Sequence, residues 1–356
     1  MRRRQATLLG ALATGATALL ALGTTAAGAS ASVSASPGNS LSSRPLPYQV
    51  FDPYYETYDA STDLASLSQQ SGAKYLSLAF LQTATAGSCT AYWNGVTTEP
   101  IAASTYGSDI AAIQASGGNV IPSFGGYGAD TTGTDIADSC TSVPAIAAVY
   151  ESLITTYNVP RIDLDVEADS LTNTAGINRR NEAIAMVEAW AAAHHRQIQF
   201  SYTLGTFPTG LPAAQLAVLQ NAVADHAQIS TVNIMTFDYY IGTEQDMVAD
   251  TESAAADVVT QLRSLYPTTP VQQLWHTIGV TEMPGIDDFG PDETFSTANA
   301  ATILHWAQQK GIGQISFWAL QRDNGGCVGT KGAGTCSGVA QPTWYFSHVF
   351  EHFTSF

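Results

Sequence analysis

Short β-branched and aromatic runs alternate with longer Ala-rich amphipathic runs from Tyr48 to the end of the chain. Runs of the first kind are typical of strands and runs of the second kind of helices, so the alternation predicts βα units and a parallel sheet. Eight strands are predicted, at residues 48–54, 75–81, 119–124, 161–167, 197–204, 231–238, 275–283 and 314–320. Helices are predicted at residues 63–71, 108–115, 144–157, 177–195, 212–226, 249–266 and 296–310, and a last one after residue 341.

Eight such units predict an α/β fold with a single closed (β/α)8 barrel of the TIM type. An open, doubly wound sheet is the alternative, and it is disfavoured because no GxGxxG turn follows the first predicted strand. The catalytic groups of such barrels gather at the C-terminal ends of the strands. Glu167 and Asp238 end the fourth and sixth predicted strands, and Arg322 and Asp323 follow the eighth. Functional residues are therefore expected at these strand ends.

The heptapeptide from Arg161 to Glu167, RIDLDVE, carries an acid at every second position. Successive side chains of a strand point to opposite faces, so Asp163, Asp165 and Glu167 share one face and the aliphatic residues between them share the other. Because a strand advances by about 6.6–7 Å per two residues, Asp163 is expected deepest in the barrel and Glu167 at its rim. Like charges on one buried face are unfavourable, so this pattern indicates chemistry or cation binding.

Catalysis is the favoured interpretation of these acids. Neighbouring carboxylates in a partly desolvated site cannot all ionise, so the pKa of Glu167 is expected to be raised, which suits a general acid. A protonated Glu beside an ionised Asp is an arrangement that cleaves glycosidic bonds. Direct attack by the second carboxylate requires a separation of about 5–5.5 Å, so the wider spacing leaves an intervening water or a nucleophile supplied by the substrate. A cation-binding or salt-bridged strand is disfavoured because the Ca²⁺-loop pattern is absent and few basic residues are available.

A secretory signal peptide is predicted at residues 1–29, because three arginines precede an apolar run that ends in small residues. The apolar run is shorter than the ~20 residues that a membrane span needs. Residues 30–43 are rich in Ser and Ala and are predicted to form a flexible lead-in, and residues 44–356 are predicted to form the catalytic barrel. The protein is therefore expected to be secreted and extracellular.

The chain carries 13 Lys and Arg residues against 30 Asp and Glu residues. Removal of residues 1–29 takes away three of the basic residues and no acid, which leaves a formal charge of −20. Binding to nucleic acid or to anionic lipid rests on clustered Lys and Arg, so neither a nucleic acid nor a membrane is expected as a partner. A neutral or cationic substrate fits this composition better.

Four cysteines in an exported chain predict two disulfides. Cys327 and Cys336 lie in one Gly-rich loop and are expected to pair with each other, which leaves Cys89 with Cys140. A metal site is not predicted, because CxxC is absent and the seven histidines do not cluster at ligand spacing apart from one vicinal pair.

Four motifs in this chain resemble those of the glycoside hydrolase family 18 chitinases. The family signature D-x-x-D-x-D-x-E is matched at its last three acids by Asp163, Asp165 and Glu167. The other motifs are S-x-G-G at residues 123–126, M-x-Y-D at residues 235–238, and the tryptophan of the eighth strand at Trp318. The resemblance covers essentially all of the chain after the predicted leader. It implies a secreted endo-acting chitinase that hydrolyses β-1,4 linkages between N-acetylglucosamine units.

The resemblance also implies a role for each site residue. Glu167 would protonate the leaving oxygen in a retaining, substrate-assisted mechanism. Asp165 would orient the 2-acetamido group of the substrate and stabilise the oxazolinium ion, and Asp163 would share a proton with Asp165. Ser123 would contact the buried acid, and the pocket of the cleaved sugar would be lined by Met235, Asp238 and Trp318, with the tryptophan stacked beneath the sugar. Chitin or N-acetylglucosamine oligosaccharides are the expected partners, no cofactor is expected, and the protein is expected to be a monomer.

Two residues depart from the family pattern. Pro160 stands in place of the first acid of the signature. Phe237 stands in place of a tyrosine whose hydroxyl holds the acetamido oxygen in the family. The missing hydroxyl is hypothesised to come from Tyr239, Tyr240 or Tyr202.

Other functions on the same barrel stay open at this point: a non-catalytic chitin-binding or inhibitor protein, and an endo-β-N-acetylglucosaminidase acting on glycoproteins, or an enzyme acting on peptidoglycan. The presence of Glu167 favours an enzyme, since lectin-like relatives typically lose that acid. The segment from Met283 to Ser296 is too short for the α+β insertion of some family members, which implies an open cleft and endo-type cleavage. The aromatic residues that could stack on sugars near the cleft are Tyr54, Tyr55, Tyr92, Trp93, Tyr127 and Tyr240.

Overall fold

The computed structural model describes residues 44–59 and 63–354. Its main sheet has the strand order β1-β12-β9-β8-β7-β6-β5-β3-β2, all parallel, and β4 pairs with β3 in the antiparallel sense. The strands of this sheet are β1 (Val50–Phe51), β2 (Tyr54–Glu56), β3 (Tyr75–Thr83), β4 (Ala91–Trp93), β5 (Asn119–Gly125), β6 (Arg161–Val166), β7 (Gln199–Gly205), β8 (Ile229–Met235), β9 (Ile278–Glu282) and β12 (Gln314–Phe317). A separate antiparallel hairpin consists of β10 (Gly285–Ile286) and β11 (Thr294–Phe295).

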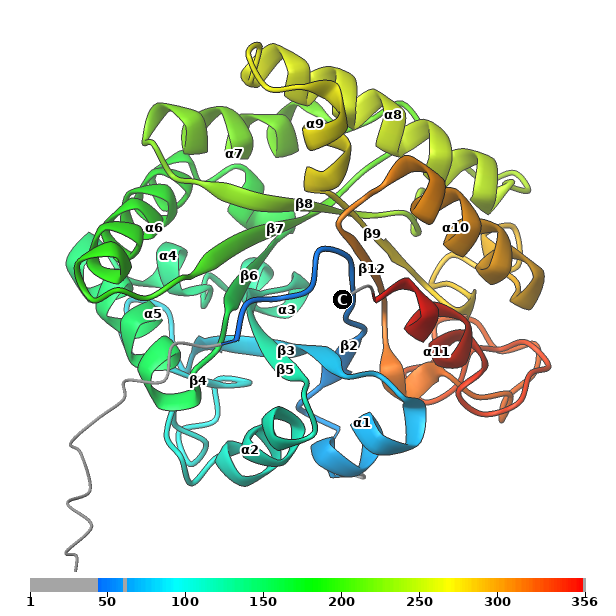
Figure 1. The fold of residues 1–356 in the computed structure, drawn as a ribbon, viewed down its shortest axis with the longest axis horizontal. Coiled ribbons are helices and arrows are strands. Elements are labelled where there is room, and N and C mark those ends of the chain that lie inside the picture. The colour runs from blue at the N-terminus through cyan, green and yellow to red at the C-terminus, as the bar shows by residue number, and fades with distance from the viewer. Residues whose placement is uncertain (1–43, 60–62, 355–356) are drawn as a thin grey trace, which may run out of the picture. The chain divides into compact units, whose positions relative to one another are not determined.

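Helices surround the strands on the outside of the sheet (Figure 1). They are α1 (Leu64–Ser71), α2 (Gly107–Ala115), α3 (Tyr127–Thr132), α4 (Ile136–Ser139), α5 (Val143–Tyr157), α6 (Thr174–Ala193), α7 (Ala213–Ala224), α8 (Met247–Leu265), α9 (Val271–Thr277), α10 (Thr297–Lys310) and α11 (Tyr345–Phe350). Short 3-10 turns are η1 (Ala168–Leu171), η2 (Leu320–Arg322) and η3 (Glu351–Phe353). In the described residues, no helix is both long enough and apolar enough to cross a bilayer.

The first strand closes the sheet into a barrel, although it is split into β1 and β2. β1 pairs with β12, and β2 pairs with β3. The hydrogen bonds continue through the split, because the Asp52 amide donates to the Ile315 carbonyl at 3.1 Å and the Ser77 amide donates to the Pro53 carbonyl at 3.0 Å. The predicted TIM barrel is therefore confirmed, and each of the eight predicted strands is present.

One predicted strand began too early. The segment 275–283 was expected to be extended throughout, but Trp275 to Thr277 belong to α9, and β9 begins at Ile278. The β-formers at this point pack as helix residues instead, and the Trp275 ring meets the Trp306 ring edge-on at 6.3 Å. The elements predicted from the sequence do not include α3, α4, β4 or the β10–β11 hairpin, since segments of two to six residues are too short to show a helical or strand period.

Both predicted disulfides are confirmed. Cys89 bonds to Cys140 and ties the β3–β4 loop to the end of α4. Cys327 bonds to Cys336 and closes the loop that follows η2. The predicted signal peptide at residues 1–29 and the lead-in at residues 30–43 lie outside the described residues.

Glu282 supplies a stability test that is independent of any function. This acid is fully buried on β9, and its Oε1 accepts a hydrogen bond from Thr251 on α8 at 3.0 Å. Burial raises the pKa of Glu282 from 4.5 to about 8. The unfolded chain therefore releases this proton at lower pH than the folded protein does, so the free energy of unfolding falls as the pH rises between these two values.

We expect Glu282→Gln, which keeps the shape and cannot ionise, to lose less stability than the wild type between about pH 5 and about pH 8. Urea unfolding at both pH values measures this difference. Asp257→Asn is the matched control, because Asp257 is an exposed acid on α8. An equal loss of stability in Glu282→Gln and the wild type would contradict the prediction.

Candidate active site

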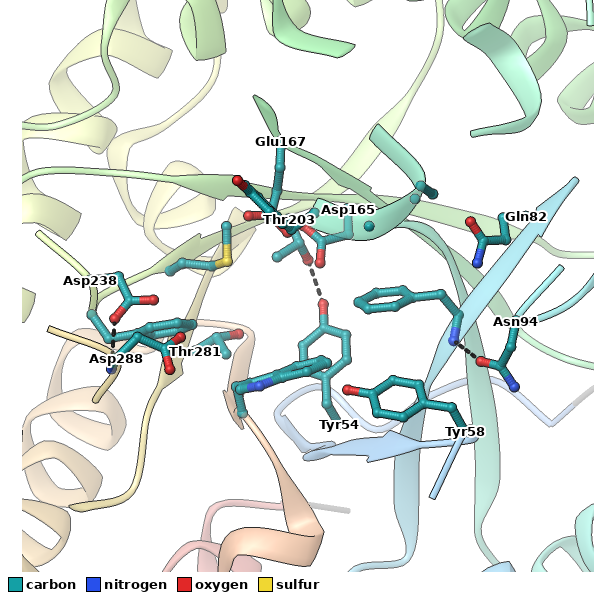
Figure 2. A pocket seen from close by; sticks show the side chains of 18 of the residues that line it. Tyr54, Tyr58, Gln82, Asn94, Asp165, Glu167, Thr203, Asp238, Thr281 and Asp288 are labelled. Carbon is teal, nitrogen blue, oxygen red and sulfur yellow. Dashed lines mark hydrogen bonds between the residues drawn. The ribbon is translucent and has the colours of Figure 1, made fainter. Parts of the chain in front are cut away.

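A cavity of about 730 Å³ lies at the C-terminal ends of the strands. Figure 2 shows its three sides in one view, with Asp238, Thr281 and Asp288 to one side, Gln82 and Asn94 to the other, and Asp165 and Glu167 between them. Gln82 and Asn94 come from the β3–β4 hairpin, which Cys89 anchors. Asp288 comes from the loop of the β10–β11 hairpin. Two hairpins that were not predicted from the sequence therefore build two walls of the cavity.

Asp163 is the deepest of the three strand acids and is almost fully buried. The parallel register places Ser123 and Ser201 beside it on the neighbouring strands. Ser123 Oγ donates to Asp163 at 2.7 Å and Ser201 Oγ at 2.6 Å, and the hydroxyls of Tyr54 and Thr203 donate at 2.9 and 3.0 Å. Burial raises the pKa of Asp163, and these four donors act in the opposite direction by stabilising the carboxylate.

Asp165 lies one level higher, in register with Gly125 and Thr203, and lines the cavity. Its Oδ1 is buried and has no hydrogen-bond partner among the described residues. Burial raises its pKa well above the ordinary value, and the charges of Glu167, Asp163 and Asp130 act in the same direction. The carboxylate of Asp163 therefore accepts hydrogen bonds from four hydroxyl groups. Asp165, which lines the cavity, has one carboxylate oxygen without a donor among the described residues.

Glu167 directly follows β6 at the rim of the same cavity and is partly buried. Burial raises its pKa to about 7, against a weaker opposing effect of the Tyr127 amide. Its own backbone amide donates to Asp130 Oδ2 at 2.5 Å. A carboxyl group with a pKa near the working pH is suited to give and take back a proton.

Two consecutive glycines let β5 end tightly against β6. Gly125 has a φ of 95°, and a Cβ there would lie 2.0 Å from the Asp165 carbonyl oxygen. Gly126 has a φ of 81°, and a Cβ there would lie 2.5 Å from the Phe80 ring. The S-x-G-G motif therefore supplies a hydroxyl for Asp163 and room for the acid-bearing strand at the same point.

Three aromatic rings line part of the cavity. The rings of Phe80 and Trp318 are stacked, with centroids 5.6 Å apart and planes 12° apart. The Tyr54 ring lies 5.6 Å from Trp318. The peptide bonds Ala79–Phe80 and Trp318–Ala319 are both cis. Ring faces of this kind offer an apolar surface beside polar groups, which is the usual composition of a small-molecule site.

Most of the residues predicted for the site come together here. Asp165, Glu167, Met235, Asp238 and Trp318 line the cavity, and Ser123 and Asp163 lie directly beneath it. Burial and the charges of Asp288 and Asp287 raise the pKa of Asp238 to about 8. Of the aromatic residues proposed near the cleft, Tyr54 and Tyr127 line the cavity, whereas Tyr55 and Trp93 are buried in the apolar core.

The three tyrosines proposed to replace the hydroxyl missing at Phe237 do not line the cavity, and that hypothesis is corrected. Tyr202 pairs in register with Leu164, on the outward face of the sheet, and its hydroxyl donates to Asn181 of α6 at 2.6 Å. Tyr239 is buried, and after burial itself the largest effects on the pKa of its hydroxyl come from the charges of Glu282 and Asp250, outside the barrel.

Tyr240 is 75% exposed, and its ring packs on that of Phe289 at 4.3 Å. The positions of Tyr239 and Tyr240 have a local cause, because Asp238 and Tyr240 both have positive φ and turn the chain out of the strand period. Phe237 itself lines the cavity.

Two residues noted after the eighth strand have structural roles instead. The guanidinium of Arg322 is buried and donates to the carbonyls of Pro284 and Ile286 at 3.1 and 2.9 Å. Asp323 accepts from the backbone amides of Phe346 and Ser347 at the start of α11, at 3.1 and 2.8 Å. Both residues hold loops together behind the cavity.

Four residues of the site are absent from those predicted from the sequence: Thr203, Asn233, Thr281 and Asp130. Asn233 Nδ2 donates to Thr203 at 2.9 Å and to Thr281 at 2.7 Å, so three neighbouring strands are linked through one amide. The signal for Thr203 was present, because Ser201 and Thr203 alternate in the same way as the acids of β6. Whether Ser201 and Thr203 face the acids of β6 depends on the register between β6 and β7. The alternation of residues within one strand does not reveal that register.

No protein-family model matches the chain. It is 29% identical over 329 residues to a probable bifunctional chitinase/lysozyme of Escherichia coli (strain K12), covering 86% of this chain and 35% of that protein. It is 28% identical over 288 residues to endochitinase 11 of Metarhizium anisopliae, covering 78% of this chain and 53% of that protein. The chain thus spans about a third and about half of the length of these relatives.

Chitinases are also found among the solved structures that resemble this chain. The catalytic domain of a hyperthermophilic chitinase from Pyrococcus furiosus is 27% identical, with a TM-score of 0.76, and the match covers 88% of this chain and 97% of that domain. A class V chitinase from Nicotiana tobaccum shares the fold at 10% identity and a TM-score of 0.56, covering 86% of this chain and 99% of that one. The chain therefore has the fold of a chitinase catalytic domain.

Proposed function

We propose that the protein is a secreted, endo-acting chitinase that hydrolyses β-1,4 linkages between N-acetylglucosamine units with retention of configuration. The observation that carries this proposal is the pair of acids on one face of β6. Glu167, with a pKa of about 7, stands at the rim of the cavity, and Asp165 presents an oxygen without a partner among the described residues below it. The proposal of secretion rests on the arginines and the apolar run at the start of the chain.

The reaction proceeds in two steps. Glu167 donates its proton to the glycosidic oxygen while the carbonyl oxygen of the substrate's 2-acetamido group attacks the anomeric carbon, so the glycosidic bond breaks as an oxazolinium ring forms. Asp165 accepts the acetamido N–H and stabilises the positive charge of that ring. The Glu167 carboxylate then takes a proton from a water molecule, which attacks the anomeric carbon, opens the ring and restores the acetamido group.

The acetamido oxygen needs a hydrogen-bond donor, and Phe237 has none. Thr281 Oγ1 is the hydroxyl that we assign to this task, because it belongs to the lining of the cavity and is held by Asn233. Its one hydrogen, which donates to Asn233 Oδ1 at 2.9 Å in the free protein, turns to the acetamido oxygen when the substrate binds. The same amide donates to Thr203, which pairs in register with Asp165. A threonine on β9 would thus replace a tyrosine that follows β8 in orienting the acetamido group.

The substrate class follows from the cavity and from a relative. Stacked rings beside hydroxyl and amide groups suit a neutral sugar, and the strongly negative chain disfavours an anionic polymer. A chitinase domain from Pyrococcus furiosus, 26% identical and with a TM-score of 0.76, was solved in complex with chito-oligosaccharides. Chitin chains are therefore the proposed substrate. The short β10–β11 hairpin at one wall supports cleavage within a chain, because no larger insertion follows β9.

A comparison of two oligosaccharides tests the mechanism. We expect the N-acetylglucosamine hexamer to be cleaved to products that first appear as the β-anomer. The fully deacetylated hexamer should stay intact, because a free amine cannot form the oxazolinium ring. Proton NMR of the anomeric region follows both reactions.

Equal cleavage of both hexamers, or initial release of the α-anomer, would overturn the mechanism. Binding of the acetylated hexamer without hydrolysis would support a non-catalytic chitin-binding protein instead. Faster release of glycans from glycoproteins, or faster cleavage of peptidoglycan, would redefine the substrate while leaving the acids in the same roles.

A further inference from the structure

Asp130 on α3 is a buried acid that the proposed mechanism does not use. It is 1% exposed and lies four residues after the S-x-G-G motif. Its Oδ2 accepts a hydrogen bond from the Glu167 amide at 2.5 Å, across 37 residues of sequence. Its Oδ1 has no hydrogen-bond partner among the described residues. A buried carboxyl is costly to keep, so its contact with the backbone of the proposed acid calls for an explanation.

The contact lies where the chain leaves the strand. β6 ends at Val166, Glu167 itself is extended with a φ of −129°, and Ala168 then has a φ of 39°. The chain therefore turns sharply directly after the acid, where the sheet no longer holds its backbone. The carboxyl of Asp130 fixes the amide at this point, and the Glu167 side chain begins one bond farther along.

Several elements around Asp130 carry charged or polar groups. Asp135 belongs to the turn that starts α4, Arg180 to α6, Ser170 to η1 and Asp165 to β6. Arg180 donates to Asp135 at 2.7 Å and lies 3.8 Å from Asp138. Its positive charge is therefore paired with two acids other than Asp130.

Burial and the charge of Asp135 raise the pKa of Asp130 to about 8, while Arg180, the Glu167 amide and the Ser170 hydroxyl lower it. Asp130 therefore holds its proton to higher pH than an ordinary aspartic acid does. Its protonated form can hold the Glu167 amide without adding a negative charge beside Asp165.

We propose that Asp130 is a positioning residue for Glu167: its carboxyl group fixes the backbone of the acid at the turn after β6, and thereby fixes where the acid meets the glycosidic oxygen. This inference rests on the proposed function of Glu167. Misplacement of a reacting group by about 1 Å can cost about 100-fold in rate. The effect should appear in kcat, since Asp130 lies behind the acid and does not line the cavity.

Two substitutions separate the hydrogen bond from the charge. Asp130→Asn keeps a carbonyl oxygen that can accept the Glu167 amide, and it resembles the protonated acid. Asp130→Ala removes the acceptor. We expect Asp130→Ala to lower kcat between about 10-fold and 100-fold with KM within about twofold of the wild type, and Asp130→Asn to stay within about threefold in kcat.

The pH profile distinguishes positioning from a general loss of folded protein. Water admitted to the space left in Asp130→Ala should lower the pKa of Glu167, so the alkaline fall of kcat moves to lower pH. A merely structural role would reduce kcat equally at every pH. Asp169→Asn is the matched control, because Asp169 is an exposed acid two residues after Glu167.

A direct measurement of the hydrogen bond does not depend on the folding of Asp130→Ala. In Glu167→Gln, which removes the residue's own titration, the amide resonance of residue 167 should titrate with a midpoint near the Asp130 pKa of about 8. The titration should vanish when Asp130→Asn is added. A flat amide resonance, or wild-type kcat and pH profile in Asp130→Ala, would overturn the inference. An active Glu167→Gln enzyme would instead overturn the proposed function itself.

Discussion

Replacement of Glu167 by Gln is expected to lower kcat on chito-oligosaccharides by roughly 10²–10⁴-fold, the usual contribution of a general acid. Glutamine has the same shape but cannot protonate the leaving oxygen. The side chain of Glu167 lies at the rim of the cavity and is only partly buried, so the fold should be unaffected. The measurement is the initial rate on a labelled oligosaccharide at saturating concentration, with thermal unfolding of both proteins as a check on folding.

The activity of the wild type is also expected to depend on pH through the protonation of Glu167. Burial raises the pKa of Glu167 to about 7, and the reaction needs the protonated form. Activity should therefore be high below that pKa and fall as the pH rises through it. Any residual activity of Glu167→Gln should lack this fall, whereas Asp169→Asn should keep both the rate and the profile. Wild-type turnover in Glu167→Gln would show that another group donates the proton.

Replacement of Asp165 by Asn is expected to lower kcat by about 10²–10³-fold, because a neutral amide cannot stabilise the positive oxazolinium ring as a carboxylate does. The substitution should not destabilise the protein. Asp165 is buried with an unpartnered oxygen and a raised pKa, so an uncharged isostere removes a desolvation cost and breaks no hydrogen bond of that oxygen.

Asp163→Asn is the comparison that makes this test selective. Asp163 accepts hydrogen bonds from four hydroxyl groups, so an amide there loses acceptors and should lower the melting temperature. Measured together, Asp165→Asn should lose rate while keeping stability, and Asp163→Asn should lose stability. A loss of rate in Asp165→Asn that merely followed a loss of folded protein would argue against a role for Asp165 in the reaction.

Local patterns predicted much of this molecule correctly. The alternation of strand and helix runs predicted the barrel, because the spacing of apolar residues that identifies a strand or a helix is a property of each segment alone. The same period of two placed Asp163 and Asp165 on one face, and the structure places Asp163 below Asp165 as expected. Cysteine spacing predicted both disulfides, because Cys327 and Cys336 share one short loop.

Errors arose where a side chain's direction depended on a neighbouring strand or on one unusual dihedral angle. Tyr202 was considered as a hydroxyl donor, but the register of β7 on β6 pairs it with Leu164 on the outer face. A shift of one residue in the pairing of β7 with β6 would have turned Tyr202 to the inner face, and the sequence does not specify this register. Tyr239 left the strand period because Asp238 has a φ of 54°.

The sequence alone therefore determined the barrel, the shared face of the strand acids and the two disulfides, because each follows from spacing within one segment or from simple pairing. Only the tertiary structure decided which hydroxyls surround Asp163, which hairpins wall the cavity, and that Asp130 reaches the Glu167 amide from another element. The physical reason is that period is a property of a short stretch of backbone. A hydrogen bond between distant residues exists only after packing has set the register and direction of both partners.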